Sequence, residues 1–190
     1  MTPFDVVPIP GKGFGAFAKK EYEIDEEVYQ ENPLVYLYGL NKPYTDAQKR
    51  ELEEKVESLP SKVKQDYFNL SNVFPTEVDA VGIFMTNCFD IDDGKGSALY
   101  INLARINHSC YPNCKQKYYF DNINNILIEK LICIQNIHLH EEITVSYINP
   151  LQSTNDRQEL LLKNYCFKCD CFLCNAVNNN PTLRRFMRSA

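Results

Sequence analysis

Residues 107–114 read NHSCYPNC, and they concentrate polar side chains next to the mostly apolar residues 103–106. Burying polar groups costs free energy unless they are hydrogen-bonded, so this density is typical of a functional site. His108 and Cys110 could form a nucleophilic pair, or His108 could be a hydrogen-bonded core residue. This segment alone leaves both interpretations open.

A second dense segment lies further along the chain, where Cys166, Cys169, Cys171 and Cys174 fall within nine residues. Zn²⁺ takes four thiolates at about 2.3 Å in a closed tetrahedral structural site. Because no secretory signal precedes the cluster, zinc binding is favoured over disulfides, over buried free thiols and over an iron–sulfur cluster. The cluster could supply all four ligands, or three of its cysteines could bind together with Cys110.

Gly11, Gly13 and Gly15 form a glycine-rich turn near the N-terminus. A dinucleotide-binding fingerprint would open a helix, whereas strand-like sequence follows this turn. We therefore expect a β-turn whose backbone could let a ligand approach closely.

The order of the remaining patterns predicts an α+β protein. Strand-like sequence covers residues 1–38 and 100–148, including a hairpin turn over 121–125 and a strand over 143–148. Helical patterns cover residues 45–60, 62–70, 76–89 and 153–163, with a capping box at Thr45 and Gln48 and with Val78, Val81 and Met85 expected on the buried face of the third helix.

The composition favours a globular protein of one domain, with at most a small appendage, because 190 residues with 44% hydrophobic and 24% charged residues are ordinary for one. A formal net charge of −5 argues against a protein that binds nucleic acid directly. No apolar run reaches the roughly 18 residues of a membrane helix. We expect an intracellular protein of the nucleus, the cytoplasm or both.

Taken together, four segments resemble the SET-domain protein lysine methyltransferases, most closely the SMYD branch. They occur in the family's order and are the glycine turn at 11–15, NHSCxPN at 107–113, the strand at 141–147 that ends in a tyrosine, and the cysteine segment at 165–174. The resemblance spans nearly the whole chain, which makes coincidence a poor explanation.

This resemblance implies the β-rich SET fold, with a pseudoknot-like crossing beside the active site. It implies S-adenosyl-L-methionine as methyl donor and a zinc-binding post-SET segment. The implied catalytic residue is Tyr147, and the implied substrate channel includes Tyr165 and Asn87. The implied cofactor-binding residues are Lys12, Gly13, Phe14, Ala104, Asn107, His108, Tyr165 and Phe167.

The resemblance also implies a zinc ligand set of Cys110, Cys169, Cys171 and Cys174, which leaves Cys166 as a spare. The chain departs from the SMYD pattern in three places. Cysteine-free helical sequence at 44–70 stands where that branch has its MYND finger, its C-terminal helical domain has no counterpart, and His140 stands where a glycine is common.

We therefore expect a SET domain over 1–150 with a helical insert at 44–90, a post-SET segment at 151–175 and a loosely ordered tail at 176–190. The expected function is methylation of a lysine in a histone or another protein. The alternative is a catalytically inactive SET-type interaction module that contains zinc. The expected partner is a protein or peptide substrate with a target lysine. We expect no direct binding to nucleic acid or to a membrane, and we expect the chain to be a monomer.

Overall fold

The computed structural model has a mixed α+β fold and describes residues 2–38, 44–91, 96–121 and 126–179. The chain forms two compact units: Met1–Tyr29 with Ile106–Gln116 and Leu131–Ala190, and Gln30–Arg105 with Lys117–Lys130. The expected hairpin turn lies outside the described residues from position 122, and the expected tail lies outside them from position 180.

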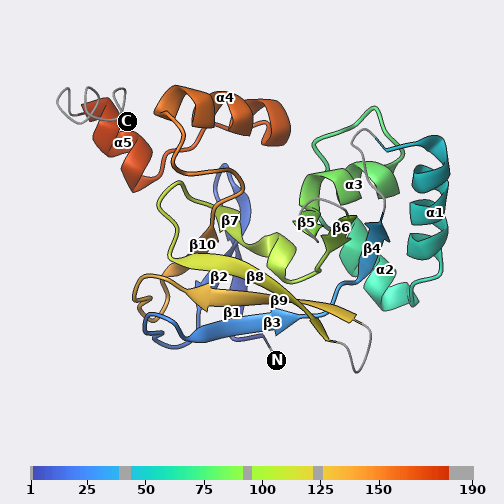
Figure 1. Ribbon diagram of the computed structural model, residues 1–190, viewed down its shortest axis with the longest axis horizontal. Coiled ribbons are helices and arrows are strands. Elements are labelled where there is room, and N and C mark those ends of the chain that lie inside the picture. The colour runs from blue at the N-terminus through green and yellow to red at the C-terminus, as the bar shows by residue number, and fades with distance from the viewer. Residues whose placement is uncertain (1, 39–43, 92–95, 122–125, 180–190) are drawn as a thin grey trace. The chain divides into compact units, whose positions relative to one another are not determined.

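The first unit is built on a four-stranded sheet with the order β1-β2-β10-β7. Strands β1 (Phe4–Ile9) and β2 (Gly13–Ala18) form an antiparallel hairpin around the glycine turn (Figure 1). Strand β10 (Glu142–Val145) pairs antiparallel with β2 and parallel with β7 (Asn107–His108). The parallel pair joins segments that are distant in sequence, which places the NHSC segment beside the strand that leads to Tyr147.

Asn113 fixes this crossing of the chain through its side chain. The Asn113 amide Nδ2 donates to the Glu142 carbonyl at 2.8 Å, and Oδ1 accepts from the Thr144 backbone N–H at 2.8 Å. Asn113 is 7% exposed, so the polar atoms of its own side chain depend on these two bonds. The asparagine that ends the NHSCxPN motif therefore holds β10 in place.

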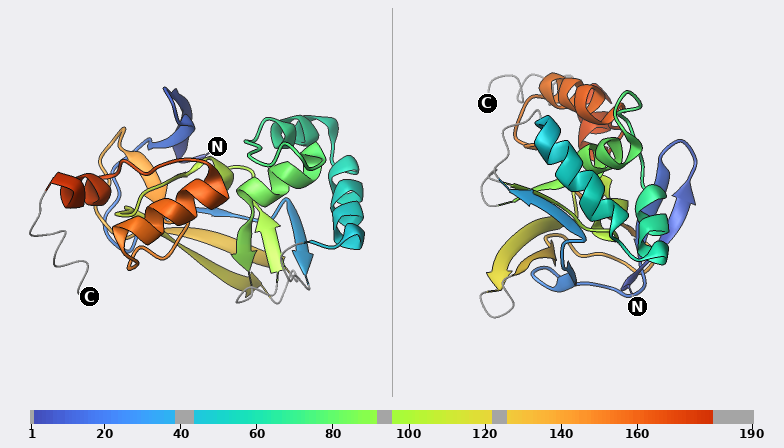
Figure 2. Two further views of the ribbon diagram at one scale, coloured as in Figure 1. Left: turned by 90° about the horizontal axis from the view of Figure 1, so that it is seen from above. Right: turned by 90° about the vertical axis from the view of Figure 1, so that its right-hand side faces the viewer.

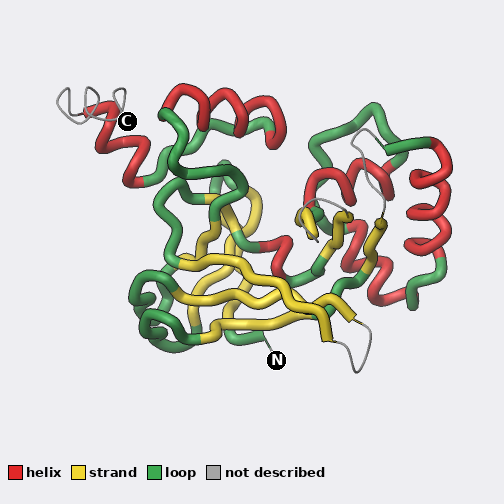
Figure 3. The backbone as a smooth tube through the Cα atoms, viewed as in Figure 1, coloured by secondary structure: helices red, strands yellow, loops and turns green. Residues whose placement is uncertain are grey.

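Two helices follow in the first unit. Helix α4 (Thr154–Tyr165) begins at Ser153, whose hydroxyl accepts from the backbone N–H of Asp156, as the sequence predicts. It ends at Cys166 in a left-handed conformation with φ 61°. The cysteine segment then leads into α5 (Phe172–Asn179), and Figure 3 shows a loop between the two helices.

The second unit packs three helices against a sheet with the order β4-β6-β5 (Figures 1 and 2). The strands are β4 (Val35–Tyr38), β6 (Gly96–Leu99) and β5 (Phe89–Ile91), and the helices are α1 (Asp46–Glu57), α2 (Ser61–Phe68) and α3 (Asp79–Asn87). Their apolar faces form one core that includes Leu37, Leu52, Tyr67 and Phe84. The capping box at Thr45 is confirmed.

A further sheet has the order β3-β9-β8, with β3 at Glu27–Glu31, β9 at Ile126–Cys133 and β8 at Cys114–Asp121. Among the described residues, no helix is both long and apolar enough to cross a membrane.

Two local predictions are wrong. Val78 is 60% exposed rather than inward, because α3 begins only at Asp79 and Val78 is its extended N-cap residue. The strand expected over 143–148 ends at Val145, because the backbone N–H of Tyr147 donates to the His108 ring instead of to a neighbouring strand.

Candidate cofactor and zinc site

The glycine turn requires two of its glycines for backbone reasons and the third for space. Gly11 and Gly13 have φ values of +76° and +77°, a left-handed conformation that side chains disfavour. A Cβ at Gly15 would overlap the Ile9 side chain and lie 2.8 Å from the Glu142 carboxylate. Gly15 therefore lies tightly against Ile9 and Glu142, whereas Gly11 and Gly13 have open space around them.

Asn107 joins this turn to the NHSC segment. Its amide Nδ2 donates to the Phe14 carbonyl and to Glu142 Oε1, each at 2.8 Å. Its carbonyl oxygen Oδ1 accepts no hydrogen bond from the described residues. Asn107 therefore presents one unused acceptor beside the glycine turn, where a positively charged amino group could bind.

Four rings form a connected cluster next to this point. The ring of His108 lies 5.3 Å from that of Tyr147 and 6.0 Å from that of Phe167, and the ring of Tyr165 lies 5.0 Å from that of Tyr147. Tyr147, Tyr165 and Phe167 are half-buried. Two loops that are distant in sequence, around 107 and 165, therefore meet in the first unit.

Tyr147 is held by two hydrogen bonds. Its hydroxyl donates to the Ile106 carbonyl at 2.6 Å, and its backbone N–H donates to His108 Nδ1 at 3.0 Å. Burial, with a smaller contribution from Tyr165, raises the pKa of the Tyr147 hydroxyl above its ordinary value. Tyr147 is thus a neutral phenol at physiological pH, with its oxygen lone pairs directed away from Ile106.

The two bonds of His108 fix its tautomer. Because Nδ1 accepts from Tyr147, the proton of the neutral ring is on Nε2, which lies 3.2 Å from the Cys110 sulfur. Burial lowers the pKa of His108 to about 4. Both ring nitrogens are used within the chain, so His108 can offer a cofactor its backbone and the face of its ring.

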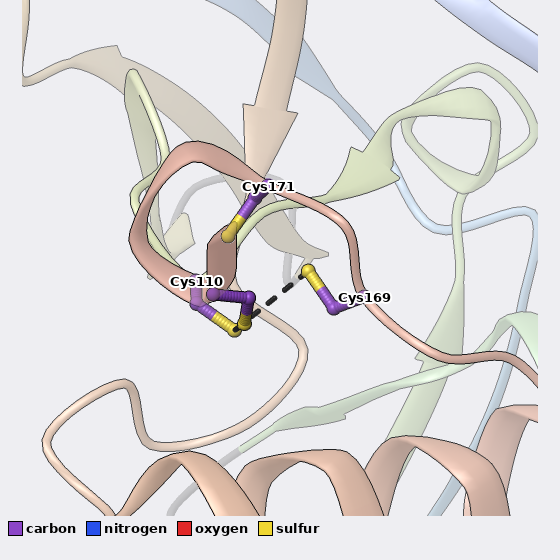
Figure 4. Close-up of side chains that lie close together, drawn as sticks. Cys110, Cys169 and Cys171 are labelled. Atoms are coloured by element: carbon purple, nitrogen blue, oxygen red, sulfur yellow. Dashed lines mark hydrogen bonds between the residues drawn. The ribbon is translucent and has the colours of Figure 1, made fainter. Parts of the chain in front are cut away.

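The sulfurs of Cys110, Cys169, Cys171 and Cys174 all lie within 4.8 Å of one another. Figure 4 shows three of these side chains turned towards one another. The Cys110 sulfur is 3.8 Å from that of Cys169 and 3.6 Å from that of Cys174. A tetrahedron with metal–sulfur bonds of about 2.3 Å has edges of roughly 3.8 Å, so the four residues fit a zinc ion.

Cys166 lies apart from this cluster. It is exposed and forms the left-handed C-cap of α4, while Cys110 takes the fourth position. The spacing of the local cysteines could not reveal this, because Cys110 is 56 positions (166 − 110) before Cys166 in the sequence.

Lys12 connects the glycine turn to the cysteine segment. Its Nζ lies 2.7 Å from Asp170 Oδ1, and this hydrogen bond is the largest cause of the raised pKa of Lys12. Both side chains are about half exposed or more, at 47% and 67%, so the pair adds little to stability. It does place residue 170 beside the turn.

Comparison with known proteins gives a family for this chain, because the profile of the SET domain matches residues 13–148, which include Asn107, His108 and Tyr147 but not the cysteine segment. The chain belongs to the SET-domain family. The resemblance predicted from the motifs is confirmed, and so is the mixed α+β, β-rich SET fold.

Three relatives of this SET domain carry names that describe methyltransferases. The chain is 29% identical over 181 residues to "Histone-lysine N-methyltransferase set5" of Schizosaccharomyces pombe, covering 92% of this chain and 53% of that protein. It is 35% identical over 114 residues to "N-lysine methyltransferase SMYD2" of Bos taurus, covering 56% and 25%. It is 32% identical over 88 residues to "Histone-lysine N-methyltransferase SMYD3" of Homo sapiens, covering 46% and 19%. The chain thus spans about half the length of set5 and a quarter or less of the other two.

Two predicted site residues belong to the second unit of the SET-domain chain. Ala104 lies in the short 3-10 helix Leu103–Arg105 and packs against that unit's core. Asn87 ends α3, and its amide donates to the carbonyls of Ser71 and Ile83, each at 2.7 Å. Their roles in the cofactor pocket and the substrate channel stay predictions.

Sequence reasoning missed two residues of this SET-domain site. Glu142 accepts from the Asn107 amide, and Arg157 lies fully buried with its guanidinium near the Cys174 sulfur. Nothing in the sequence singled out Arg157, because it is followed by the three consecutive leucines 160–162 and only the structure shows that Leu161, on the same helix face as Arg157, is the buried one.

Proposed function

We propose that this chain is an S-adenosylmethionine-dependent protein-lysine N-methyltransferase whose substrate is a protein or peptide with an accessible lysine. The observation that carries the proposal is the meeting of three separate segments in the first unit. Asn107 bonds to the glycine turn, and Tyr147 packs between His108 and Tyr165. These contacts bring a free acceptor, a glycine turn and a cluster of rings to one place, which is the arrangement that a cofactor site needs.

The residues that would hold the cofactor are those around the glycine turn. Bound S-adenosylmethionine would supply a methyl group on a positively charged sulfur. Asn107 Oδ1 can accept from its amino group, and the backbone of Gly13 and Phe14 lies close enough to the Asn107 amide to border the same site. The faces of His108 and Phe167 provide apolar surface for a flat ring.

The target lysine has to lose its proton before it can react. At pH 7 only about one lysine in 10³ is neutral, because its ordinary pKa is near 10.4. The rings of Tyr147, Tyr165 and Phe167 form an apolar wall, and desolvation beside such a wall lowers the pKa of an amine. This wall would raise the share of the neutral nucleophile.

The Tyr147 hydroxyl would act by position rather than by proton transfer. Its proton is committed to the Ile106 carbonyl, so its oxygen can face the reacting groups only as an acceptor. An oxygen fixed in this way can orient an amine N–H or stabilise positive charge in the transition state. Because its pKa is raised, it keeps this role throughout the physiological range.

Zinc would have a structural role. Four cysteine ligands leave no open position on the ion, so the metal would not take part in the reaction. Tyr147, Tyr165 and Phe167 pack against the cysteine cluster. We propose that zinc binding folds residues 166–174 into the wall of the site, as the post-SET segment of the sequence prediction.

Tyr147→Phe tests the proposal most simply. We expect the rate of methyl transfer to fall about 10²-fold or more, because the positioned oxygen is lost. Binding of S-adenosylmethionine should change by no more than about threefold, because the ring remains. The measurements are transfer of labelled methyl groups onto a cell lysate, with identification of the modified residue, and calorimetric titration with the donor.

Tyr119→Phe is the matched control, because this tyrosine is 39% exposed on β8 in the second unit. It should transfer methyl groups at the rate of the unchanged chain. Unchanged kinetics in Tyr147→Phe would remove Tyr147 from catalysis. Donor binding with no lysine methylation by the unchanged chain would favour the inactive interaction module instead.

A further inference from the structure

Arg157 is a buried arginine in the middle of α4. It is 0% exposed, although arginine is almost never fully buried unless it is paired. Its Nη1 donates to the Gln152 carbonyl at 2.6 Å, and its Nη2 donates to Thr154 Oγ1 at 3.2 Å. Its Nε has no hydrogen-bond partner among the residues that the structure describes.

The described residues place no carboxylate within ion-pair distance of this guanidinium. The group that it faces is the cysteine cluster, because Nη2 lies 3.8 Å from the Cys174 sulfur. The counter-charge of this cation is therefore the cluster itself.

The charge of the cluster explains why a cation is needed there. Four thiolates around one Zn²⁺ carry two negative charges in excess, and three of the four cysteines, namely Cys110, Cys169 and Cys174, are buried. Uncompensated charge in a buried position is strongly disfavoured. A fixed guanidinium cancels one of the two excess charges without occupying a position on the metal.

We propose that Arg157 is the counter-cation of a zinc–tetracysteine centre and stabilises the bound metal through the Cys174 sulfur. The proposal rests on the zinc site described above and extends it to a residue outside the ligand set. Two donors from different elements then reach the ligand sulfurs, Arg157 at Cys174 and the Nε2–H of His108 at Cys110. Outer-sphere groups of this kind orient metal ligands and tune their affinity.

The neighbour of Arg157 supports the same function for α4. Gln158 Nε2 donates to the Cys169 carbonyl at 2.7 Å, and Gln158 Oε1 accepts from the Cys169 backbone N–H at 3.0 Å. Two consecutive residues of α4 thus contact two of the four ligands. Arg157 contacts the Cys174 sulfur through its charge, and Gln158 is hydrogen-bonded to the backbone of Cys169. Helix α4 is in this sense the support of the metal centre.

The test compares Arg157→Gln, which keeps N–H donors but loses the charge, with Arg157→Lys, which keeps the charge. Zinc affinity is measured by competition with a chelator, and the cobalt-substituted chain is followed by its visible spectrum. We expect Arg157→Gln to bind zinc about 10- to 100-fold more weakly and to shift the cobalt bands. Arg157→Lys should recover most of the affinity.

Leu161→Ala is the matched control, because Leu161 packs against the same cluster from the same helix face without any charge. It should lower the melting temperature while zinc affinity stays within about twofold. Equal affinity in Arg157→Gln and the unchanged chain would overturn the proposal. So would an Arg157→Lys variant as weak as Arg157→Gln, or a Leu161→Ala variant that loses as much affinity. Each of these results leaves the methyltransferase proposal standing, whereas an unchanged chain that takes up no zinc or cobalt would overturn the metal site itself.

Discussion

Glu129 is a single buried carboxyl group with a measurable consequence for stability. It is 2% exposed on β9, and burial raises its pKa to about 7. The unfolded chain ionises this group near its ordinary pKa, so between about pH 4.5 and 7 the folded chain binds more protons. The contribution of Glu129 to the free energy of unfolding is therefore fully present below about pH 4.5 and is lost as the pH rises towards and past 7.

Glu129→Gln removes this dependence. At pH 8 the variant should be more stable than the unchanged chain by on the order of 1–3 kcal/mol, and near pH 4.5 the two should be alike. Urea denaturation at several pH values measures both. The exposed Glu54→Gln in α1 serves as control and should leave the pH profile unchanged. A parallel profile for Glu129→Gln and the unchanged chain would contradict the role given to burial.

For single residues, the sequence predicted a place in the site only for those that belong to a recognised motif. Asn107, His108 and Tyr147 were singled out from their segments, and they lie together around one corner of the first unit. Arg157 and Glu142 were not singled out, because a charged residue in an ordinary helix or strand looks like a solvated one. Only the packed structure shows that Arg157 faces sulfurs.

The site depends on the parallel pairing of β7 with β10. The side chain of Asn113 stabilises this pairing through its hydrogen bonds to β10. Asn113→Ala would leave the Glu142 carbonyl and the Thr144 N–H without their partner and would open a cavity where the buried Asn113 side chain was. We expect a loss of about 2–4 kcal/mol in the free energy of unfolding. Denaturant titration measures it.

Asn164→Ala is the control for this prediction, because Asn164 is exposed on α4. It should change stability by less than about 0.5 kcal/mol. If Asn113→Ala were as mild as Asn164→Ala, the crossing would have to be held by other contacts.

Elements with side-chain caps were predictable from the sequence, and elements that depend on distant partners were less so. Thr45 and Ser153 start their helices as expected, since a cap is a local interaction. Helix α3 was predicted to begin at residue 76 but begins at Asp79. Its N-cap residue is Val78, whose side chain cannot accept a hydrogen bond. The end of β10 before Tyr147 depends on His108, 39 positions away in sequence.

On the scale of the whole chain, the family resemblance predicted which segments meet, and local spacing did not. The glycine turn, the NHSC segment and the cysteine segment are linked in the first unit by Asn107, Lys12 and the ring cluster. Local spacing left the choice between Cys110 and Cys166 open, the resemblance implied Cys110, and the four sulfurs that lie together include that of Cys110. How a substrate chain reaches the site, and which lysine it presents, is a matter of surfaces that motifs do not encode.

The central claim is that the cysteine segment, held by its metal, closes a donor site against the glycine turn. Calorimetric titration of the zinc-loaded chain with S-adenosylmethionine, repeated after removal of zinc by a chelator, tests it most directly. We predict one binding site in the loaded chain and affinity at least about tenfold lower without zinc. A folded, zinc-loaded chain that binds no donor, or equal affinity with and without the metal, would contradict the claim.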